Sequence, residues 1–202
     1  MQNQKVPVAG LLLMALIAFS MSAGDLAARF APKPVDFPPA AVEGPVSAVP
    51  QTSPVVLEQK ALVEHLSSKY NRPTQFVSRI VKAAYHEARQ VGMSPLLVLA
   101  VIEKESGLDP KARSSYGAVG LMQVVPRFHL DKIRSAGAGG AYDPEVNIRV
   151  GTAILADYRH ANRGDINSAL VQYSGQSRGY VQRVVSYKKE LEAVKAQALR
   201  RT

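Results

Sequence analysis

Cysteine is absent from the 202 residues of this chain, and tryptophan is absent as well. The lack of cysteine excludes disulfides, a thiol nucleophile and any metal site built on thiolates. It also excludes a lipid-modified cysteine behind an N-terminal apolar segment. Hydrophobic residues make up 47% of the chain, so a packed core is expected without covalent cross-links.

Acidic residues are scarce relative to basic ones. The chain has 16 Asp and Glu but 25 Lys and Arg, which gives a formal net charge of +9 and a pI of about 9.9. This excess predicts either a merely solvated basic surface or one that concentrates an anionic polymer. A nucleic acid would also suit the charge, but the N-terminal segment argues against this partner because it indicates export.

Metal-ligand patterns are missing too. The four histidines lie far apart in the sequence and lack ligand spacing: His65, His86, His129 and His160. We therefore expect no metal site and no cofactor.

The N-terminal segment has the pattern of a secretory signal peptide over residues 1–24. Lys5 precedes an apolar run from Val6 to Phe19, and small residues follow at positions 20, 22, 23 and 24. An uncleaved membrane anchor is the alternative, because 19 uncharged residues extend from Val6 to Gly24. Pro7 and the short apolar centre favour cleavage.

A proline-rich linker is predicted over residues 25–54. Its prolines are too dense for a helix or a central strand: Pro32, Pro34, Pro38, Pro39, Pro45, Pro50 and Pro54. A domain over residues 55–187 should follow, and then a basic C-terminal tail over residues 188–202, which is expected to be a frayed or solvated helix.

The pattern within this domain is helical. Leu57, Ala61, Leu62 and Leu66 recur at three- and four-residue spacing, and a second helix with Thr74 as its cap should follow. The stretch 96–102 is apolar on every side, which predicts a buried central helix that has Ser94 as its N-cap and Pro95 as its first residue and ends at Gly107.

The second half of the domain repeats these signals. Asp143-Pro144 predicts a helix start, Asp165 should cap a helix over residues 166–173, and a last helix should carry Tyr180. A short segment near residues 120–125 is the single β candidate. The fold class is therefore mostly α with minimal β structure.

Two acids near the end of the central helix are candidates for acid catalysis. Glu105 follows Val98, Val101 and Ile102 on one helical stripe, whereas Glu103 lies on another, so periodicity does not choose between them. A carboxyl group buried at a helix C-terminus has a raised pKa, because both burial and the helix dipole disfavour its charge. Such a group retains a proton for general acid catalysis at neutral pH.

A second catalytic carboxylate, as most glycosidases use, is not evident from any motif. The candidates are isolated: Asp109, Asp131, Asp143, Asp157 and Asp165. Of these, Asp143 and Asp165 have the sequence context of helix caps, and Asp109 precedes a proline in a predicted turn.

An ordered set of motifs resembles the lytic transglycosylases of the soluble (SLT) type. The set covers about residues 95–185 and consists of these segments: Glu105-Ser106, the serine-to-glycine stretch with Ala112, Ser114, Gly117 and Ala118, the glycine-rich GAVGLMQ over 117–123, DPEVNIRVG over 143–151, ALVQYSG over 169–175, and YVQRV over 180–184. Ser174 departs from the pattern, since asparagine is usual there.

The resemblance implies roles for individual residues. It places the catalytic acid directly before a serine, which selects Glu105 over Glu103. Substrate-binding roles are implied for Ser106, Ser114, Met122, Gln123 and Tyr173, with the Tyr173 hydroxyl directed at the glutamate or the sugar. Asn147 is expected to support the catalytic loop.

The resemblance also implies a lysozyme-like fold and an activity. The family cleaves the β-1,4 bond between N-acetylmuramic acid and N-acetylglucosamine in peptidoglycan and forms 1,6-anhydromuramic ends, with one glutamate acting first as acid and then as base. The alternatives are a muramidase that uses water and a binding module without activity. The expected partners are the glycan strands, with a secretion or pilus apparatus as a further candidate, and the expected location is the periplasm or cell envelope.

Overall fold

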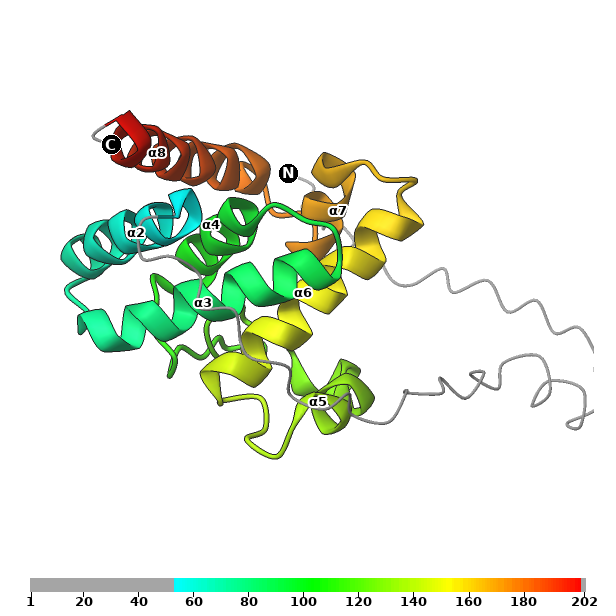
Figure 1. Cartoon of the computed structure of the whole chain (residues 1–202). Coiled ribbons are helices and arrows are strands. Elements are labelled where there is room, and N and C mark those ends of the chain that lie inside the picture. The colour runs from blue at the N-terminus through cyan, green and yellow to red at the C-terminus, as the bar shows by residue number, and fades with distance from the viewer. Residues whose placement is uncertain (1–52, 201–202) are drawn as a thin grey trace, which may run out of the picture. The chain divides into compact units, whose positions relative to one another are not determined.

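The computed structural model describes residues 53–200, which lie within one compact unit. This part contains seven α-helices and a short 3-10 helix (Figure 1): α2 (Pro54–Tyr70), α3 (Thr74–Gln90), α4 (Pro95–Ser106), η1 (Pro126–Phe128), α5 (Leu130–Ala136), α6 (Pro144–Ala161), α7 (Ile166–Tyr173) and α8 (Tyr180–Arg200). The prediction of a mostly helical domain is confirmed.

The domain begins at Ser53, two residues before its predicted start at residue 55. Ser53 is the N-cap of α2 and accepts a hydrogen bond from the backbone N–H of Val56 at 3.4 Å, so Pro54 is the first helical residue and not part of the linker. The predicted signal peptide and the rest of the linker lie outside the described residues. Within residues 53–200, no helix is long and apolar enough to cross a membrane.

Helix α4 is the core of the domain, as its sequence predicted. Every residue from Leu96 to Glu103 is buried, and α4 packs against α3 and α8. Gly107 ends the helix in the left-handed conformation with φ +55°. The prediction for Thr74 was wrong in detail, because Thr74 is the first residue of α3 and Pro73 occupies the cap position without a side-chain hydrogen bond.

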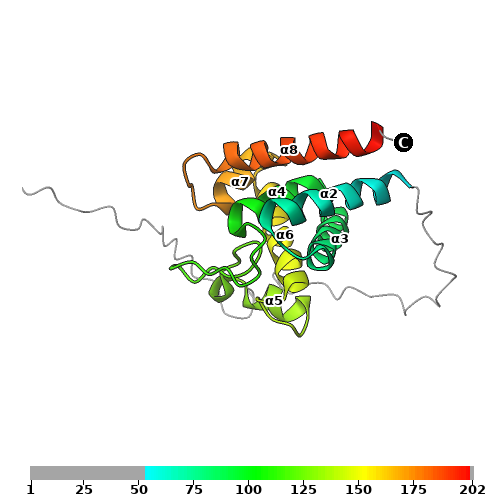
Figure 2. The ribbon, with the colours of Figure 1, turned by 90° about the vertical axis from the view of Figure 1, so that its left-hand side faces the viewer.

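Helix α8 agrees with the prediction that the tail is helical but contradicts its separation from the domain as a frayed or solvated segment. It continues from Tyr180 to Arg200 without a break and packs along α4 and α2, as both views show (Figures 1 and 2). Leu191 is fully buried and Val194 is partly buried against the same core, so apolar contacts hold this charged segment on the domain. Some charges of this segment also face the domain, because Lys195 pairs with the buried Glu58 and Glu190 pairs with Lys69.

The aspartate caps are confirmed. Asp143 accepts a hydrogen bond from the N–H of Val146 at 2.9 Å and starts α6, while Asp165 accepts from Asn167 and Ser168 and starts α7. Helix α6 packs against both α3 and α7, and with α5 it surrounds a second, smaller apolar cluster. Its members are Val124, Ile133, Ala136, Val146, Val150 and Ile154.

The segment between α4 and η1 folds back on itself and makes the β structure expected near residues 120–125. Val119 forms antiparallel bridges with Arg113 and Val124, and its N–H donates to the Val124 carbonyl at 2.8 Å. This turn lies beside the C-terminal end of α4, so it borders the acid that the sequence singled out.

Candidate active site

Glu105 lies in the last turn of α4 and lines a pocket of about 390 Å³. The pocket is formed by the end of α4, the turn after it, the end of α7 and the start of α8. Its lining residues are Lys104, Glu105, Ser114, Tyr116, Ala118, Gln123, Val125, Tyr173, Ser174, Gly175, Ser177 and Tyr180. Four elements distant in sequence thus converge on one carboxyl group.

The environment of Glu105 favours its protonated form. Burial raises the pKa of the Glu105 carboxyl above its ordinary value, although a hydrogen bond from Tyr180 and the positive charge of Lys104 act in the opposite direction. A carboxyl group of this kind donates a proton near neutral pH more readily than an exposed glutamate does.

Glu103 points to a different part of the molecule. Its Oε2 accepts hydrogen bonds from Lys69 Nζ and from the Tyr70 hydroxyl, each at 2.8 Å, and Lys69 also pairs with Glu190 of α8. Its side chain is fully buried in the helical packing and does not line the pocket. The two acids that periodicity could not separate therefore have different surroundings.

Tyr180 is the residue whose importance the sequence did not reveal. Its hydroxyl donates a hydrogen bond to Glu105 Oε1, while Lys104 Nζ lies 5.2 Å from the centre of its ring. The side chain is buried, and burial together with the charge of Glu105 raises its pKa. The motif YVQRV had placed Tyr180 within the family resemblance, but nothing local indicated that α8 returns to the end of α4.

Tyr173 also lines the pocket, but its hydroxyl has another partner. It donates to the backbone carbonyl of Met122 at 2.8 Å, and burial raises its pKa well above the ordinary value. The hydrogen bond to Glu105 comes from Tyr180 and not from Tyr173, while the alternative expectation, that the Tyr173 hydroxyl is directed at the sugar, stays a prediction. Tyr173 instead connects α7 to the glycine-rich turn.

Asn147 holds the glycine-rich turn from the side of α6. The buried amide accepts from the Met122 N–H at 2.7 Å and donates to the carbonyls of Val119 and Ala141 at 2.9 and 2.7 Å. Gly120 has φ +76°, and a Cβ there would lie 2.4 Å from Asn147 Nδ2. The close approach requires glycine at this position.

Met122 and Ser106 are not among the residues that line the pocket, and their contact with substrate stays a prediction. Met122 is fully buried against α6, where a Cβ on Gly151 would lie 2.7 Å from its sulfur. The Ser106 hydroxyl donates to the Leu121 carbonyl at 2.8 Å and so fastens the turn to the end of α4. Both residues are held in contacts with the glycine-rich turn or with α6, which support the turn that lines the pocket.

Gln123 and Ser114 do lie in the pocket wall. Gln123 adopts φ +49°, and its Nε2 donates to the carbonyls of Gly120 and Ala112 at 3.0 and 3.2 Å. The Ser114 hydroxyl accepts from the Ala118 N–H at 3.0 Å. Ser174 lines the pocket as well, and its hydroxyl donates to the Val171 carbonyl at 2.9 Å.

A second pocket of about 220 Å³ adjoins the first and shares Gln123, Val125, Tyr173 and Gly175 with it. The two pockets therefore form one groove, which we call the Glu105 groove. Glu105 is the only acidic side chain among the residues that line it in the described part of the chain. His129 lines the second pocket, and burial lowers its pKa.

The other acids considered from the sequence are engaged elsewhere. Asp143 and Asp165 cap helices, Asp157 pairs with Lys132 at 2.7 Å, and Asp109 lies 3.5 Å from Arg72. Asp131 is fully exposed on α5. Over residues 53–200 no group of three or more histidine and carboxylate side chains is arranged to bind a metal ion.

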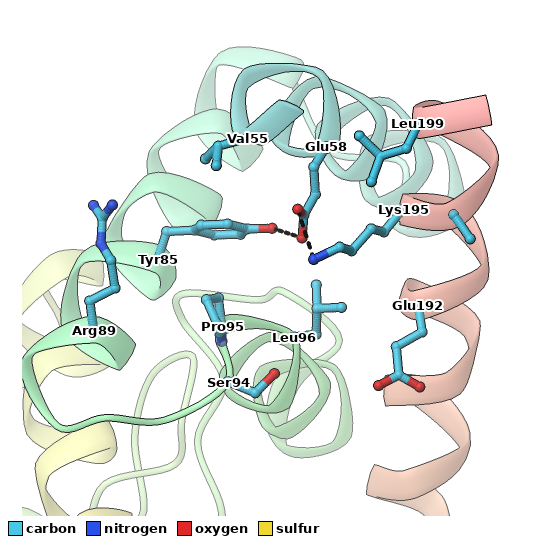
Figure 3. A pocket seen from close by; sticks show the side chains of 11 residues that line it. Val55, Glu58, Tyr85, Arg89, Ser94, Pro95, Leu96, Glu192, Lys195 and Leu199 are labelled. Carbon is cyan, nitrogen blue, oxygen red and sulfur yellow. Dashed lines mark hydrogen bonds and ion pairs between the residues drawn. The ribbon is translucent and has the colours of Figure 1, made fainter. Parts of the chain in front are cut away.

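A larger pocket, of about 610 Å³, lies at the opposite end of α4 (Figure 3). It contains a buried acid, Glu58, but this carboxylate accepts a hydrogen bond from the Tyr85 hydroxyl and pairs with Lys195 at 3.0 Å. Both oxygens of this carboxylate are therefore already engaged by side chains of the protein. The smaller groove at Glu105 is the better candidate site despite its size.

Fold and site together define a helical domain with one half-buried glutamate, Glu105, in a groove at the end of its central helix, and the comparison with known families agrees. Residues 82–196 match the Transglycosylase SLT domain, and the chain belongs to this family. The match extends through most of α8, in keeping with its packing on the domain.

Two relatives with similar sequences are also named as transglycosylases. A transglycosylase of Enterobacteria phage PRD1 is 40% identical over 87 residues, which are 43% of this chain and 31% of the phage protein. Membrane-bound lytic murein transglycosylase C of Cronobacter sakazakii is 35% identical over 117 residues, which are 51% of this chain and 32% of that protein. The chain thus matches about a third of the length of each relative.

A solved structure supports the fold. The lytic transglycosylase Slt of Pseudomonas aeruginosa, crystallised as an inactive glutamate-to-glutamine mutant, superimposes with a TM-score of 0.50 at 24% identity. The similarity covers 59% of this chain and 24% of that one. The lysozyme-like, mostly helical fold predicted from the sequence is confirmed.

Proposed function

We propose that this protein is a peptidoglycan lytic transglycosylase and that Glu105 is its catalytic residue. The observation that carries the proposal is the solitary position of Glu105: it is half-buried, has a raised pKa and is the only acid lining the groove in the described residues. Membership of the SLT family and the names of the two relatives support the same reaction.

In the first step, Glu105 donates its proton to the glycosidic oxygen as the bond from C1 of N-acetylmuramic acid breaks. The carboxylate that results accepts a hydrogen bond from Tyr180, which stabilises it after the proton has left. Lys104, whose charge lowers the pKa of Glu105, stabilises the same carboxylate.

In the second step, the Glu105 carboxylate removes the proton from the 6-hydroxyl of the same sugar as that oxygen bonds to C1. The product is a 1,6-anhydromuramic end, no water is consumed, and Glu105 regains its proton. A conventional glycosidase would need a second carboxylate about 5–9.5 Å away to act as nucleophile or to activate water. The lining of the groove supplies no such group in the described residues.

The remaining predicted site residues divide between contact and support. Gln123 and Ser114 line the groove and are proposed to bind the sugar, together with the ring of Tyr173. Asn147, Met122 and Ser106 position the turn that carries Gln123, through the hydrogen bonds described above.

Product mass tests the proposal. Purified peptidoglycan is digested with the protein and the fragments are analysed by mass spectrometry. Anhydro ends, lighter by one water than the hydrolytic product, are expected. Reducing ends would identify a muramidase, and the absence of fragments with retained binding would identify an inactive cell-wall module.

Location and partners form a separate proposal. We infer that the protein acts in the periplasm or cell envelope after export through residues 1–24, and that a secretion or pilus apparatus is a candidate recruiting partner. Cleavage near residues 22–24 would be detected by N-terminal sequencing of protein from the cell envelope. An intact Met1 in the membrane fraction would instead identify an anchor.

A further inference from the structure

An exposed arginine is held between two aromatic rings along the Glu105 groove. The guanidinium carbon of Arg127 lies 4.7 Å from the centre of the Phe128 ring and 5.7 Å from that of Tyr116. We call these three residues the aromatic–arginine rim. Tyr116 lines the pocket that contains Glu105, and Phe128 lines the adjoining pocket. The rim therefore borders both parts of the groove.

The rim is ordered but open to solvent. Arg127 Nη1 donates to the Tyr116 carbonyl at 3.0 Å, which fixes the guanidinium on the turn. No acidic side chain among residues 53–200 forms an ion pair with Arg127, so its remaining donors stay available to a ligand. Tyr116 and Phe128 are 76% and 68% exposed, so both rings are open to a ligand.

A planar guanidinium with free donors is suited to a carboxylate, which it binds through paired hydrogen bonds. In a peptide-bearing glycan strand the lactyl carboxyl of muramic acid is tied up as an amide, so the charged carboxylates belong to the peptide. A substituent that projects from a sugar in the groove would meet groups on its rim before groups on its floor.

We propose that the aromatic–arginine rim binds a carboxylate of the peptide stem and makes peptide-bearing strands better substrates than bare ones. This inference rests on the proposed function, because it assigns a substrate feature to the same groove. Arg127 is a specificity-determining residue in this proposal, and the chemistry at Glu105 does not depend on it.

The test compares Arg127→Met with the unchanged protein on three preparations of glycan strands. One carries intact peptides, one carries peptides whose carboxyls have been converted to methylamides, and one has been stripped by an amidase, which exposes lactyl carboxylates. Arg127→Met should lower kcat/KM on intact strands about 5- to 20-fold. On methylamidated and stripped strands the variant should match the unchanged protein within about twofold.

Arg134→Met is the matched control. It removes the same charge from an exposed site on α5, where the arginine has only a 3.8 Å contact with Asp131. This variant should behave like the unchanged protein on all three preparations, and both variants should melt at the same temperature. Binding is measured in parallel in a Glu105→Gln background, where the affinity for intact strands should fall by a similar factor on adding Arg127→Met.

Several results would overturn the inference. Equal activity of Arg127→Met on intact strands would show that the rim does not contact the substrate. Equal losses on intact and methylamidated strands would assign the rim to sugar stacking, and a loss on stripped strands would assign it to the lactyl carboxylate. The binding arm separates these results from failure of the proposed function, since it needs no cleavage.

Discussion

The same substitution at two acids of one helix separates catalysis from structure. In Glu105→Gln the amide oxygen still accepts the Tyr180 hydrogen bond, so packing is retained and only the transferable proton is lost. General acid–base catalysis contributes roughly 100- to 10,000-fold, or about 2.7–5.5 kcal/mol in the activation barrier. We expect turnover of purified peptidoglycan to fall by at least that factor.

Glu103→Gln is the control. The amide oxygen can accept from Tyr70 and Lys69, and Lys69 retains its 2.7 Å pair with Glu190, so the free energy of unfolding should change by about 1 kcal/mol or less. Activity should stay within about threefold of the unchanged protein. Turbidity clearing and the release of anhydro fragments measure both variants. The assignment would be refuted by a Glu105→Gln enzyme that clears normally, or by loss of activity in Glu103→Gln alone.

The pH dependence of stability gives an independent check on the environment of Glu105. Since the pKa of Glu105 is raised above about 4.5 in the folded protein, the folded state holds this proton more tightly than the unfolded state does. Stability from this group is present below pH 4.5 and is lost as the pH rises through the folded-state pKa. The Tm of Glu105→Gln relative to the unchanged protein should therefore increase over that interval, and a flat difference would contradict a buried, perturbed carboxyl.

Three further predictions concern the support of the site. Tyr180→Phe removes a hydrogen bond that favours the charged form of Glu105, so the alkaline limb of the pH–activity profile should move to higher pH; an unchanged limb would mean that the contact is absent in solution. Gly120→Ala combines a strained φ of +76° with a 2.4 Å clash against Asn147, and chemical denaturation should show a loss of about 2–4 kcal/mol, whereas a loss under 1 kcal/mol would show that the turn yields. Leu191→Ala should lower the free energy of unfolding by about 2–5 kcal/mol because the side chain is fully buried. An unchanged free energy of unfolding would show that the C-terminal segment is not packed on the domain.

Local chemistry determined much of the fold from sequence alone. Aspartate caps at 143 and 165, proline at the first helical position of α4 and glycine after its end depend only on neighbouring residues, so their signals are readable without tertiary structure. The continuous apolar character of residues 96–102 similarly required burial on all sides. The ordered motifs then predicted the family.

Contacts between distant elements were decided only by tertiary structure. Helical periodicity makes Glu103 and Glu105 equally plausible as the catalytic acid. Only the tertiary structure pairs Glu103 with Lys69 of α2 and places Glu105 in the groove. The return of α8, which brings Tyr180 to Glu105 across 75 positions of sequence, leaves no local signal. A hydrogen bond of this range depends on how helices pack, and packing is set by the complementarity of whole surfaces and not by the periodicity of any one segment.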